Sequence, residues 1–413
     1  MTSPLLVEKF IPGGYALATL SDPASPDHGK KVFLWNALPG ETVLDYTVTK
    51  KKSSYLEALA TSLEHPSPDR VAPRDPCFLS TSPWQILSYP AELATKSQLV
   101  VEMFREQGIA LPTPEIITDH HDYFYRNKME YSLYWDKTTE KISLAFHARG
   151  SHRKLPITSS SLERPEIFAR ALAIVADLNA RHEPAYKYQS LLLRSSLDGT
   201  VSGGLLENGH PHPTFPLLSD PLLGRSYSYS PNGFFQINLP VYSLALAEIP
   251  RYLTTDRVLD LYSGVGTIGL SVASDRSLTL VESNPSAFAE LEKNVASTKN
   301  TSAHPNIAPI LANSKAPRPD ITPILANSED ALDYIRPDTT VILDPPRAGC
   351  APALIDRLLS VAPPTIIYLS CNPITQARDL APLLEKYSLA LVKSYNFFPR
   401  TPHIENLVVL EKM

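Results

Sequence analysis

Apolar and polar positions alternate in five short runs within the first 64 residues, and turns rich in glycine and proline separate these runs. Short strands at regular spacing with turn signals between them predict a small β-barrel. We therefore expect residues 1–64 to form an OB-like barrel whose lysines suit RNA binding; a solvated β-module with ordinary lysines is the alternative. The expected strands are Leu5–Phe10, Tyr15–Leu20, Lys31–Trp35, Glu41–Lys50 and Tyr55–Leu63.

The next segment changes from strand alternation to a mixed pattern. Residues 65–90 are rich in proline and serine and are interpreted as a linker. Helical periodicity then predicts a helix over Ala91–Gly108 that ends at Gly108. This helix is assigned to an α+β domain over residues 91–225, with packing on the C-terminal domain as its alternative. The other elements expected there are strands at Tyr123–Trp135, Lys141–His147, Ser190–Leu197 and Val201–Leu206, and a helix at Arg164–Asn179.

From Val258 to the end of the sequence, apolar strands alternate with helical stretches. We therefore expect residues 226–413 to form a Rossmann-like α/β domain with a doubly wound parallel sheet. The hexapeptide Pro-Ile-Leu-Ala-Asn-Ser occurs twice, at 309–314 and at 323–328. Only the second copy is expected in the sheet, because the acidic residues directly behind it open a helix.

Composition limits the class of protein and its surroundings. The chain of 413 residues is 43% hydrophobic and 20% charged, which is typical of a globular protein of two or three domains. Its net charge of −5 gives no overall basic surface, so any contact with nucleic acid must be local. Three scattered cysteines argue against a disulfide framework. With no signal peptide or membrane helix in the sequence, we expect a cytoplasmic protein without a membrane partner, and a monomer.

One stretch of the α+β domain interleaves basic and aromatic residues. Arg126, Lys128, Arg149 and Arg153 are the candidate RNA-binding residues, and Tyr123–Tyr125 lie beside the first two in sequence. Aromatic rings can stack on bases while guanidinium and ammonium groups pair with phosphates. An ordinary sheet face is the alternative.

A glycine-rich turn follows the first strand of the C-terminal domain. Gly264 and Gly266 allow the backbone to approach a ligand closely, and the strand before them carries Asp260. A second strand ends at Glu282, 22 residues after Asp260, where a carboxylate can accept hydrogen bonds from ribose hydroxyls. This spacing favours S-adenosylmethionine over a nicotinamide cofactor.

Three later strand ends carry the candidate catalytic residues Asp344, Cys371 and Glu405. A thiolate that adds to C6 of uracil makes C5 nucleophilic toward a methyl donor, and a base must then remove the C5 proton. Cys371, Glu405 and Asp344 can supply the nucleophile, the base and a group that holds the ring edge. A buried structural thiol and a solvated carboxylate are the alternative interpretations of Cys371 and Glu405.

These motifs together resemble the RNA uracil-5-methyltransferase family, the TrmA/RumA group, and the N-terminal barrel resembles a TRAM domain. The resemblance implies an enzyme that makes 5-methyluridine in RNA through a covalent adduct between Cys371 and C6, with Glu405 as the base. The barrel favours 23S rRNA as the substrate over tRNA. The implied contacts to cofactor or target base are Gln236, Tyr262, Glu282 and Asp344, with Thr267 and Asn327 as further cofactor contacts. The motifs that carry the resemblance are Phe235–Asn238, Asp260–Gly266, Asp344–Arg347, Ser370–Pro373 and Pro402–Glu405.

Two readings from other classes stay open. One is an RNA-binding or RNA-folding protein with a vestigial site, although such a protein needs neither Cys371 nor Glu405. The other is a base-amino methyltransferase, which is disfavoured because Arg347 stands where those enzymes carry tyrosine.

The sequence departs from the family at its iron–sulfur cluster. Many members hold a four-iron cluster on four cysteines, whereas this chain has Cys77 alone in that region and no cysteine near residues 159–161. We therefore expect no cluster and no other metal, and we assign Cys350 no role. Iron analysis of anaerobically purified protein tests this expectation; stoichiometric iron with a broad visible absorption would contradict it.

Overall fold

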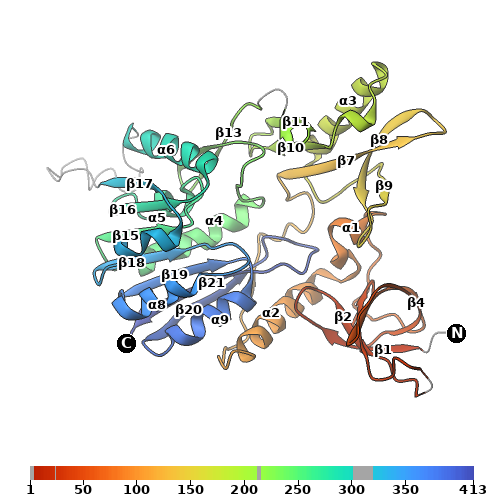
Figure 1. Ribbon diagram of the computed structural model, residues 1–413, viewed down its shortest axis with the longest axis horizontal. Helices are drawn as coiled ribbons and strands as arrows, with labels where there is room; N and C mark the ends of the chain where they lie inside the picture. The colour runs from red at the N-terminus through yellow and green to blue at the C-terminus, as the bar shows by residue number, and fades with distance from the viewer. Residues whose placement is uncertain (1–3, 24, 212–214, 301–319) are drawn as a thin grey trace.

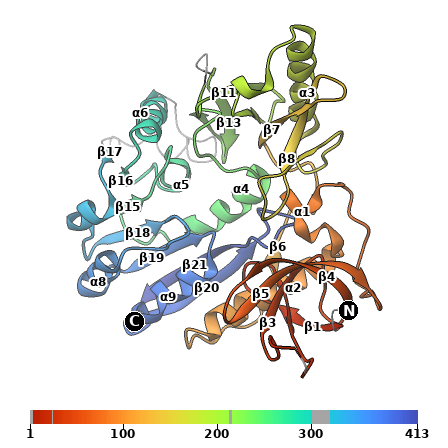
Figure 2. The same ribbon diagram turned by 45° about the vertical axis from the view of Figure 1, so that its right-hand side comes forward.

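The computed structural model describes residues 4–23, 25–211, 215–300 and 320–413. Within them the chain forms a closed five-stranded barrel, a six-stranded sheet, a short hairpin and an eight-stranded sheet (Figure 1). In Figures 1 and 2 the helix α2 (Tyr89–Arg105) lies between the barrel and the eight-stranded sheet. No described helix has the length and apolar character needed to cross a membrane.

The N-terminal barrel has the strand order β1-β2-β3-β5-β4 and confirms the predicted β-barrel. Alternate side chains of its strands, such as Leu5, Val7, Val32 and Leu34, are buried in its interior, as period-two alternation requires. The barrel strands are β1 (Leu5–Phe10), β2 (Ala16–Thr19), β3 (Lys31–Trp35), β4 (Thr42–Lys51) and β5 (Tyr55–Leu63).

Residues 65–90, the stretch interpreted as a linker, are ordered and partly buried. They contain α1 (Phe78–Thr81) and the 3₁₀ turn η1 (Pro83–Ile86). Trp84 is 1% exposed; its indole Nε1 donates to the Gly14 carbonyl at 3.1 Å, and its backbone N–H donates to the Arg400 carbonyl at 3.1 Å. This segment therefore connects the barrel directly to the C-terminal part of the chain.

Helix α2 begins two residues before its predicted start, and its end is set by Gly108. Gly108 has φ +75°, its N–H donates to the Arg105 carbonyl, and the Ile109 N–H donates to the Phe104 carbonyl, which completes a Schellman-type ending. The apolar face of α2 packs on α9 (Pro373–Leu383). Downstream of α2, β6 (Ile116–Ile117) adds a strand to the eight-stranded sheet beside β20.

The six-stranded sheet has the order β12-β11-β10-β7-β8-β9, with helix α3 packed on β8 and β10. The first strand of this sheet in chain order is β7, which begins at Lys128 and not at Tyr123 as predicted. The reason is local: Phe124 has φ +56°, outside extended backbone, and its N–H donates to the Ser161 carbonyl instead of to a sheet neighbour. The elements are β7 (Lys128–Asp136), β8 (Lys141–His147), β9 (Lys154–Pro156), α3 (Pro165–Ala180), β10 (Ser190–Ser195), β11 (Val201–Glu207) and β12 (His210–Pro211), with the hairpin β13 (Leu218–Leu222) and β14 (Arg225–Tyr229) following and the 3₁₀ turn η2 (Ala185–Lys187) between α3 and β10.

The eight-stranded sheet has the order β17-β16-β15-β18-β19-β21-β20-β6, in which only β21 runs antiparallel to its neighbours. Helices cover both faces: α8, α9 and α2 share one apolar core with the sheet, while α4, α5 and α6 share the other. The predicted doubly wound sheet is confirmed. Its elements are α4 (Leu239–Glu248), η3 (Ile249–Tyr252), β15 (Arg257–Leu261), α5 (Thr267–Val272), β16 (Ser277–Glu282), α6 (Pro285–Asn300), β17 (Ile321–Leu325), η4 (Ser328–Tyr334), β18 (Thr339–Leu343), α8 (Pro352–Val361), β19 (Thr365–Ser370), β20 (Tyr387–Tyr395) and β21 (Glu405–Lys412).

The repeated hexapeptide enters the sheet through its second copy, as predicted. Pro323–Leu325 belong to β17, which pairs with β16, and the helix opened by the acidic residues behind it is the 3₁₀ helix η4. The first copy, at 309–314, lies outside the described residues.

Candidate active site

The carboxyl ends of the parallel strands bring the predicted site residues into one row. Leu261 of β15 is level with Val281 of β16 and with Leu343 of β18, so the next residues in sequence, Tyr262, Glu282 and Asp344, lie side by side at this edge of the sheet. On the neighbouring pair, Ser370 of β19 faces Asn406 of β21. Because β21 is antiparallel, its first residue, Glu405, lies at the same edge as Cys371.

The glycine-rich turn after β15 is tightly constrained. Gly264 has φ +56°, and its N–H donates to Glu282 Oε2 at 2.8 Å. Gly266 has φ +89°, and a Cβ there would lie 2.6 Å from the Leu291 side chain. Tyr262 has φ +64°, which is costly for an aromatic residue and is typical of functional turns. A Cβ at Gly264 would meet nothing within 4 Å, so this turn leaves room beside its backbone for a ligand.

Asp260 lies buried beneath the turn with one carboxylate oxygen unused. Its Oδ2 accepts a hydrogen bond from the Gly269 N–H at 2.8 Å, while its Oδ1 has no hydrogen-bond partner among the described residues. Burial raises the pKa of Asp260 to about 8 against the lowering effect of that N–H, and the charges of Asp344 and Glu282 raise it further. A buried acceptor without a donor at an open turn fits a polar, cationic ligand such as S-adenosylmethionine.

The remaining predicted cofactor contacts have other partners as well. Thr267 Oγ1 lies 2.9 Å from the Tyr242 hydroxyl, and the exposed Asn327 donates to Asp330 Oδ2 at 2.9 Å. Gln236 is 8% exposed, and its backbone carbonyl accepts a hydrogen bond from Asn127 Nδ2 at 3.0 Å, which joins the residue before β7 of the six-stranded sheet to the segment before α4.

Cys371, Glu405 and Asp344 influence one another electrostatically. Burial raises the pKa of the half-buried Cys371 thiol to about 11, the charges of Glu405 and Asp344 raise it too, and Arg347 lowers it. Burial and then Asp344 raise the pKa of Glu405, which is 3% exposed, well above its usual range. Burial also raises the pKa of Asp344 to about 7. The three groups thus form one acidic site in which a nearby cation favours ionisation of the thiol.

Arg347 and His403 form one side of this site. The Arg347 Nη2 lies 3.3 Å from His403 Nδ1 and 3.4 Å from Nε2, and the Arg347 carbonyl accepts a hydrogen bond from Asn372 Nδ2 at 2.8 Å. Burial lowers the pKa of His403 to about 4, and the positive charge of Arg347 lowers it further, so its neutral ring can accept a hydrogen bond from the guanidinium. No role was predicted for His403 from the sequence; its position two residues before Glu405 was the available signal.

Cys350 has a structural environment. It is 4% exposed, its N–H donates to Asp379 Oδ2 at 2.8 Å, and the Tyr368 hydroxyl donates to the same oxygen at 2.9 Å. Burial raises the pKa of its thiol to about 12. Cys350 is therefore a poor nucleophile, and Asp379 holds the loop that carries Asp344 and Arg347.

The four candidate RNA-binding residues lie in different surroundings. Lys128 Nζ donates to the carbonyls of Asn232 and Gly233 at 3.2 and 3.1 Å, and Arg126 Nε donates to the Lys128 carbonyl at 2.9 Å. The Arg149 guanidinium lies 4.1 Å from the Trp35 ring centroid, whereas the Arg153 side chain is exposed. The positive charges of Arg126 and Arg149 both act on His403. These two residues therefore raise the electrostatic potential near the site.

Metal-binding groups are absent from the part of the chain that the structure describes: no three His, Cys, Asp or Glu side chains come together there. Cys77 is a free, half-buried thiol whose pKa is raised by burial and then by Asp75.

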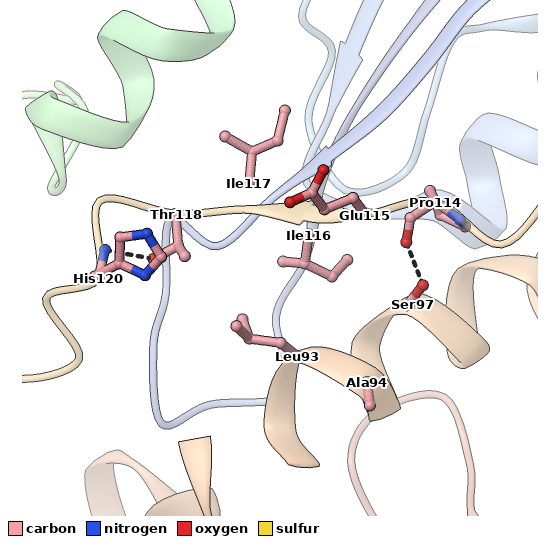
Figure 3. A pocket seen from close by; sticks show the side chains of 9 residues that line it. All are labelled: Leu93, Ala94, Ser97, Pro114, Glu115, Ile116, Ile117, Thr118 and His120. Carbon is pink, nitrogen blue, oxygen red and sulfur yellow. Dashed lines mark hydrogen bonds between the residues drawn. The ribbon is translucent and has the colours of Figure 1, made fainter. Parts of the chain in front are cut away.

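A separate pocket of about 340 Å³ lies between α2 and β6 (Figure 3). It is lined by Leu93, Ser97 and the residues of β6, and the Ser97 hydroxyl donates to the Pro114 carbonyl at its edge. None of its lining residues is a predicted site residue, so the candidate site is defined by the strand ends and not by this pocket.

Replacing Glu282 is expected to weaken binding of S-adenosylmethionine. Glu282→Ala removes the predicted acceptor for ribose hydroxyls and also the acceptor for the Gly264 N–H, so we expect a loss of about 1–3 kcal/mol, or about 5- to 150-fold in Kd. Glu282→Gln keeps one carbonyl oxygen, so its loss of affinity for S-adenosylmethionine should be smaller. Calorimetric titration of both variants tests this, and unchanged affinity in Glu282→Ala would place the cofactor elsewhere.

The raised pKa of Asp344 predicts that this residue destabilises the folded protein as pH rises. The folded pKa of about 7 exceeds the usual value of 3.8 for an aspartate, so the favourable contribution of the protonated form is present below pH 4 and is lost as pH rises through 7. Asp344→Asn should therefore melt at a higher temperature than wild type at pH 8, with an upper bound of about 4 kcal/mol. Asp333→Asn, at a fully exposed position, is the control and should melt at the same temperature as wild type at pH 8. Equal melting temperatures of Asp344→Asn and wild type at pH 8 would contradict the prediction.

The sheet order, the glycine turn and the acidic residue on the second strand define the fold of a class I methyltransferase that uses S-adenosylmethionine. Residues 224–413 match the family model described as tRNA (Uracil-5-)-methyltransferase.

Similarity to known proteins extends over nearly the whole chain. An uncharacterized RNA methyltransferase of Lactiplantibacillus plantarum is 28% identical over 92% of this chain and 88% of its own length. Another, from Nitratidesulfovibrio vulgaris, is 26% identical over 99% of this chain and 96% of its own. The crystal structure of the Pyrococcus abyssi tRNA (uracil-54, C5)-methyltransferase with S-adenosyl-L-homocysteine superposes with a TM-score of 0.73 at 20% identity, covering 98% of this chain and 99% of that one. This superposition confirms the fold.

Proposed function

We propose that this protein methylates C5 of a uridine in RNA through a covalent adduct, with S-adenosylmethionine as methyl donor. The observation that carries the proposal is the placement of Cys371 and Glu405 on paired strand ends, one residue beyond Ser370 and one before Asn406, which face each other. A thiol and a buried carboxylate at one ligand-binding edge are the two groups that this chemistry requires.

The residues act in a defined sequence. Cys371 Sγ forms a bond to C6 of the uracil, and the electron pair of the C5–C6 double bond moves toward C5 and O4. Asp260, the glycine turn and Glu282 would hold S-adenosylmethionine, which would supply an electrophilic methyl group to the activated C5 and be released as S-adenosylhomocysteine. Glu405 then takes the C5 proton, the C5–C6 double bond reforms, and Cys371 leaves as a thiolate. Its buried position and raised pKa make Glu405 a stronger base than an exposed carboxylate once it is ionised.

The positive charge of Arg347 beside Cys371 favours the addition step. The Cys371 pKa of about 11 leaves little thiolate at neutral pH, and Arg347 is the side chain whose charge lowers it. Neutral His403 holds this guanidinium without adding a competing charge. The exposed Arg347 can therefore stabilise the thiolate and the negative charge that develops on the ring.

The nature of the RNA is the finer part of the proposal. A TRAM-like barrel favours rRNA, yet the superposition with a tRNA uracil-54 enzyme covers 98% of this chain, barrel included, so the barrel alone does not exclude tRNA. Purified protein with labelled methyl donor should transfer the label to a single uridine in one of the two RNA classes. Mass-spectrometric mapping of both classes from a deletion strain should show loss of 5-methyluridine at that position. Transfer to an exocyclic amino group instead, or none to either RNA, would contradict the proposal.

A further inference from the structure

A buried ion pair on α2 contacts the loop that leads to Glu405. Glu92 and Lys96 lie one turn apart, both are 0% exposed, and Lys96 Nζ donates to Glu92 Oε1 at 2.9 Å. Both residues lie outside residues 224–413, the part of the chain that matches the methyltransferase family. They belong to a different region of the chain, which lies about 300 positions before the loop residues that they contact.

The pair binds three residues of the loop between β20 and β21. Besides Glu92, Lys96 Nζ donates to Asn396 Oδ1 at 2.6 Å and to the Phe398 carbonyl at 3.1 Å. Glu92 accepts hydrogen bonds from Asn396 Nδ2 at 3.2 Å and from the Arg400 N–H at 3.0 and 3.1 Å. All three donors of the Lys96 ammonium group are used, and both carboxylate oxygens of Glu92 accept hydrogen bonds, so the loop is held by several buried contacts.

Arg400 shows that this loop is held in a conformation that the chain would not adopt freely. It has φ +63° and is 6% exposed. Its Nη1 donates to the Leu87 carbonyl at 2.7 Å, and its Nη2 pairs with Asp122. A non-glycine residue in the left-handed region costs about 1–3 kcal/mol unless its surroundings fix it. Here those surroundings are α2 and the residues that flank it.

The loop ends at the residues proposed to act in catalysis. His403 lies in the loop and contacts Arg347, and Glu405 is the first residue of β21 after the loop. Strand pairing of Glu405 with Tyr395 fixes its backbone, whereas the path of the loop decides what packs beside its carboxylate and where His403 holds Arg347.

We infer that Glu92 and Lys96 are positioning residues for Glu405, which set the loop so that its carboxylate can remove the C5 proton. The inference rests on the proposed function. A buried ion pair seldom stabilises a fold more than apolar residues of similar size would. Here the pair provides specific hydrogen bonds. Two leucines could fill the same volume but could not bind a side-chain amide, a carbonyl and an N–H of the loop.

The test removes both charges together, since one alone would leave the other buried and unpaired. In Glu92→Gln/Lys96→Met we expect turnover to fall about 10- to 100-fold, the scale for a small misplacement of a catalytic group. Addition and methyl transfer do not need Glu405, so a covalent protein–RNA adduct that already carries the methyl group should accumulate on denaturing gels. Kd for S-adenosylmethionine should change less than about threefold.

Two further variants complete the design. Glu102→Gln breaks the ion pair between Glu102 of α2 and Lys9 of β1, whose N···O distance is also 2.9 Å, and should behave as wild type. Asn396→Ala removes a loop contact of both residues but leaves their charges paired, and should accumulate the same adduct with a smaller loss of turnover.

Accumulated methylated adduct in the double variant or in Asn396→Ala supports the inference. It is overturned if both turn over at the wild-type rate, or if both lose turnover without adduct. Absence of methylation by the wild-type protein itself would instead contradict the proposed function, so the two failures are distinguishable.

Discussion

Cys371→Ala is expected to abolish both methylation of RNA and formation of any covalent protein–RNA complex. Without the Cys371 sulfur no bond forms at C6, so C5 never becomes nucleophilic enough to take the methyl group. Loss of a covalent nucleophile typically costs on the order of 10⁴-fold or more in turnover. The measurement is transfer of labelled methyl groups to RNA together with denaturing gel electrophoresis.

Cys350→Ala is the matched control for this variant. Cys350 is a thiol in the same domain, buried and engaged in hydrogen bonds through its backbone. We expect Cys350→Ala to form the adduct and methylate RNA, with a small loss of stability from the missing sulfur. Methylation by Cys371→Ala at a rate near wild type would overturn the reaction class, and inactivity of both variants would remove the distinction between the two thiols.

Glu405→Gln is expected to stop the reaction one step later. The amide keeps the shape of the carboxylate but cannot accept the C5 proton at neutral pH, so addition and methyl transfer proceed while elimination fails. The variant should accumulate an adduct that carries one methyl group per RNA, and multiple turnover should fall by about 10²- to 10⁴-fold. Labelled methyl donor and a denaturing gel detect this species.

The result has a clear contrary outcome. A Glu405→Gln protein that turns over like wild type would exclude Glu405 as the base. An adduct that contains no methyl group would show that Glu405 acts before methyl transfer, and its role would then have to be assigned to the addition step.

The order of the strands and the chemistry at their ends could be predicted because both depend on local sequence. Apolar runs such as Thr365–Ser370 specify buried strands wherever they pair, and the carboxyl ends of parallel strands meet at one edge. Cys371 and Asp344 were therefore found from their positions after such runs. The place of Glu405 could not be predicted from such a run alone, because Glu405 reaches this edge only through the antiparallel pairing of β21 with β19.

Contacts between distant segments could not be predicted in the same way. Nothing in the proline-rich stretch 65–90 indicates that Trp84 contacts both Gly14 and Arg400, because each partner is far away in sequence. The two residues of β6 are too few to give a strand pattern, and they join the sheet through their pairing with β20. Glu92 and Lys96 have the spacing of a common surface ion pair, and only the fold shows that they are buried against the loop between β20 and β21.

Trapping with 5-fluorouridine tests the central claim most directly. RNA that carries this analogue at the target position should accept the methyl group and then stay attached to the wild-type protein, because a base cannot remove fluorine from C5 as it removes a proton. Peptide mass spectrometry should locate a methylated fluorouridine on Cys371. An adduct on Cys350 or on any other residue, or no adduct at all while the same protein methylates uridine in the unsubstituted RNA, would contradict the account.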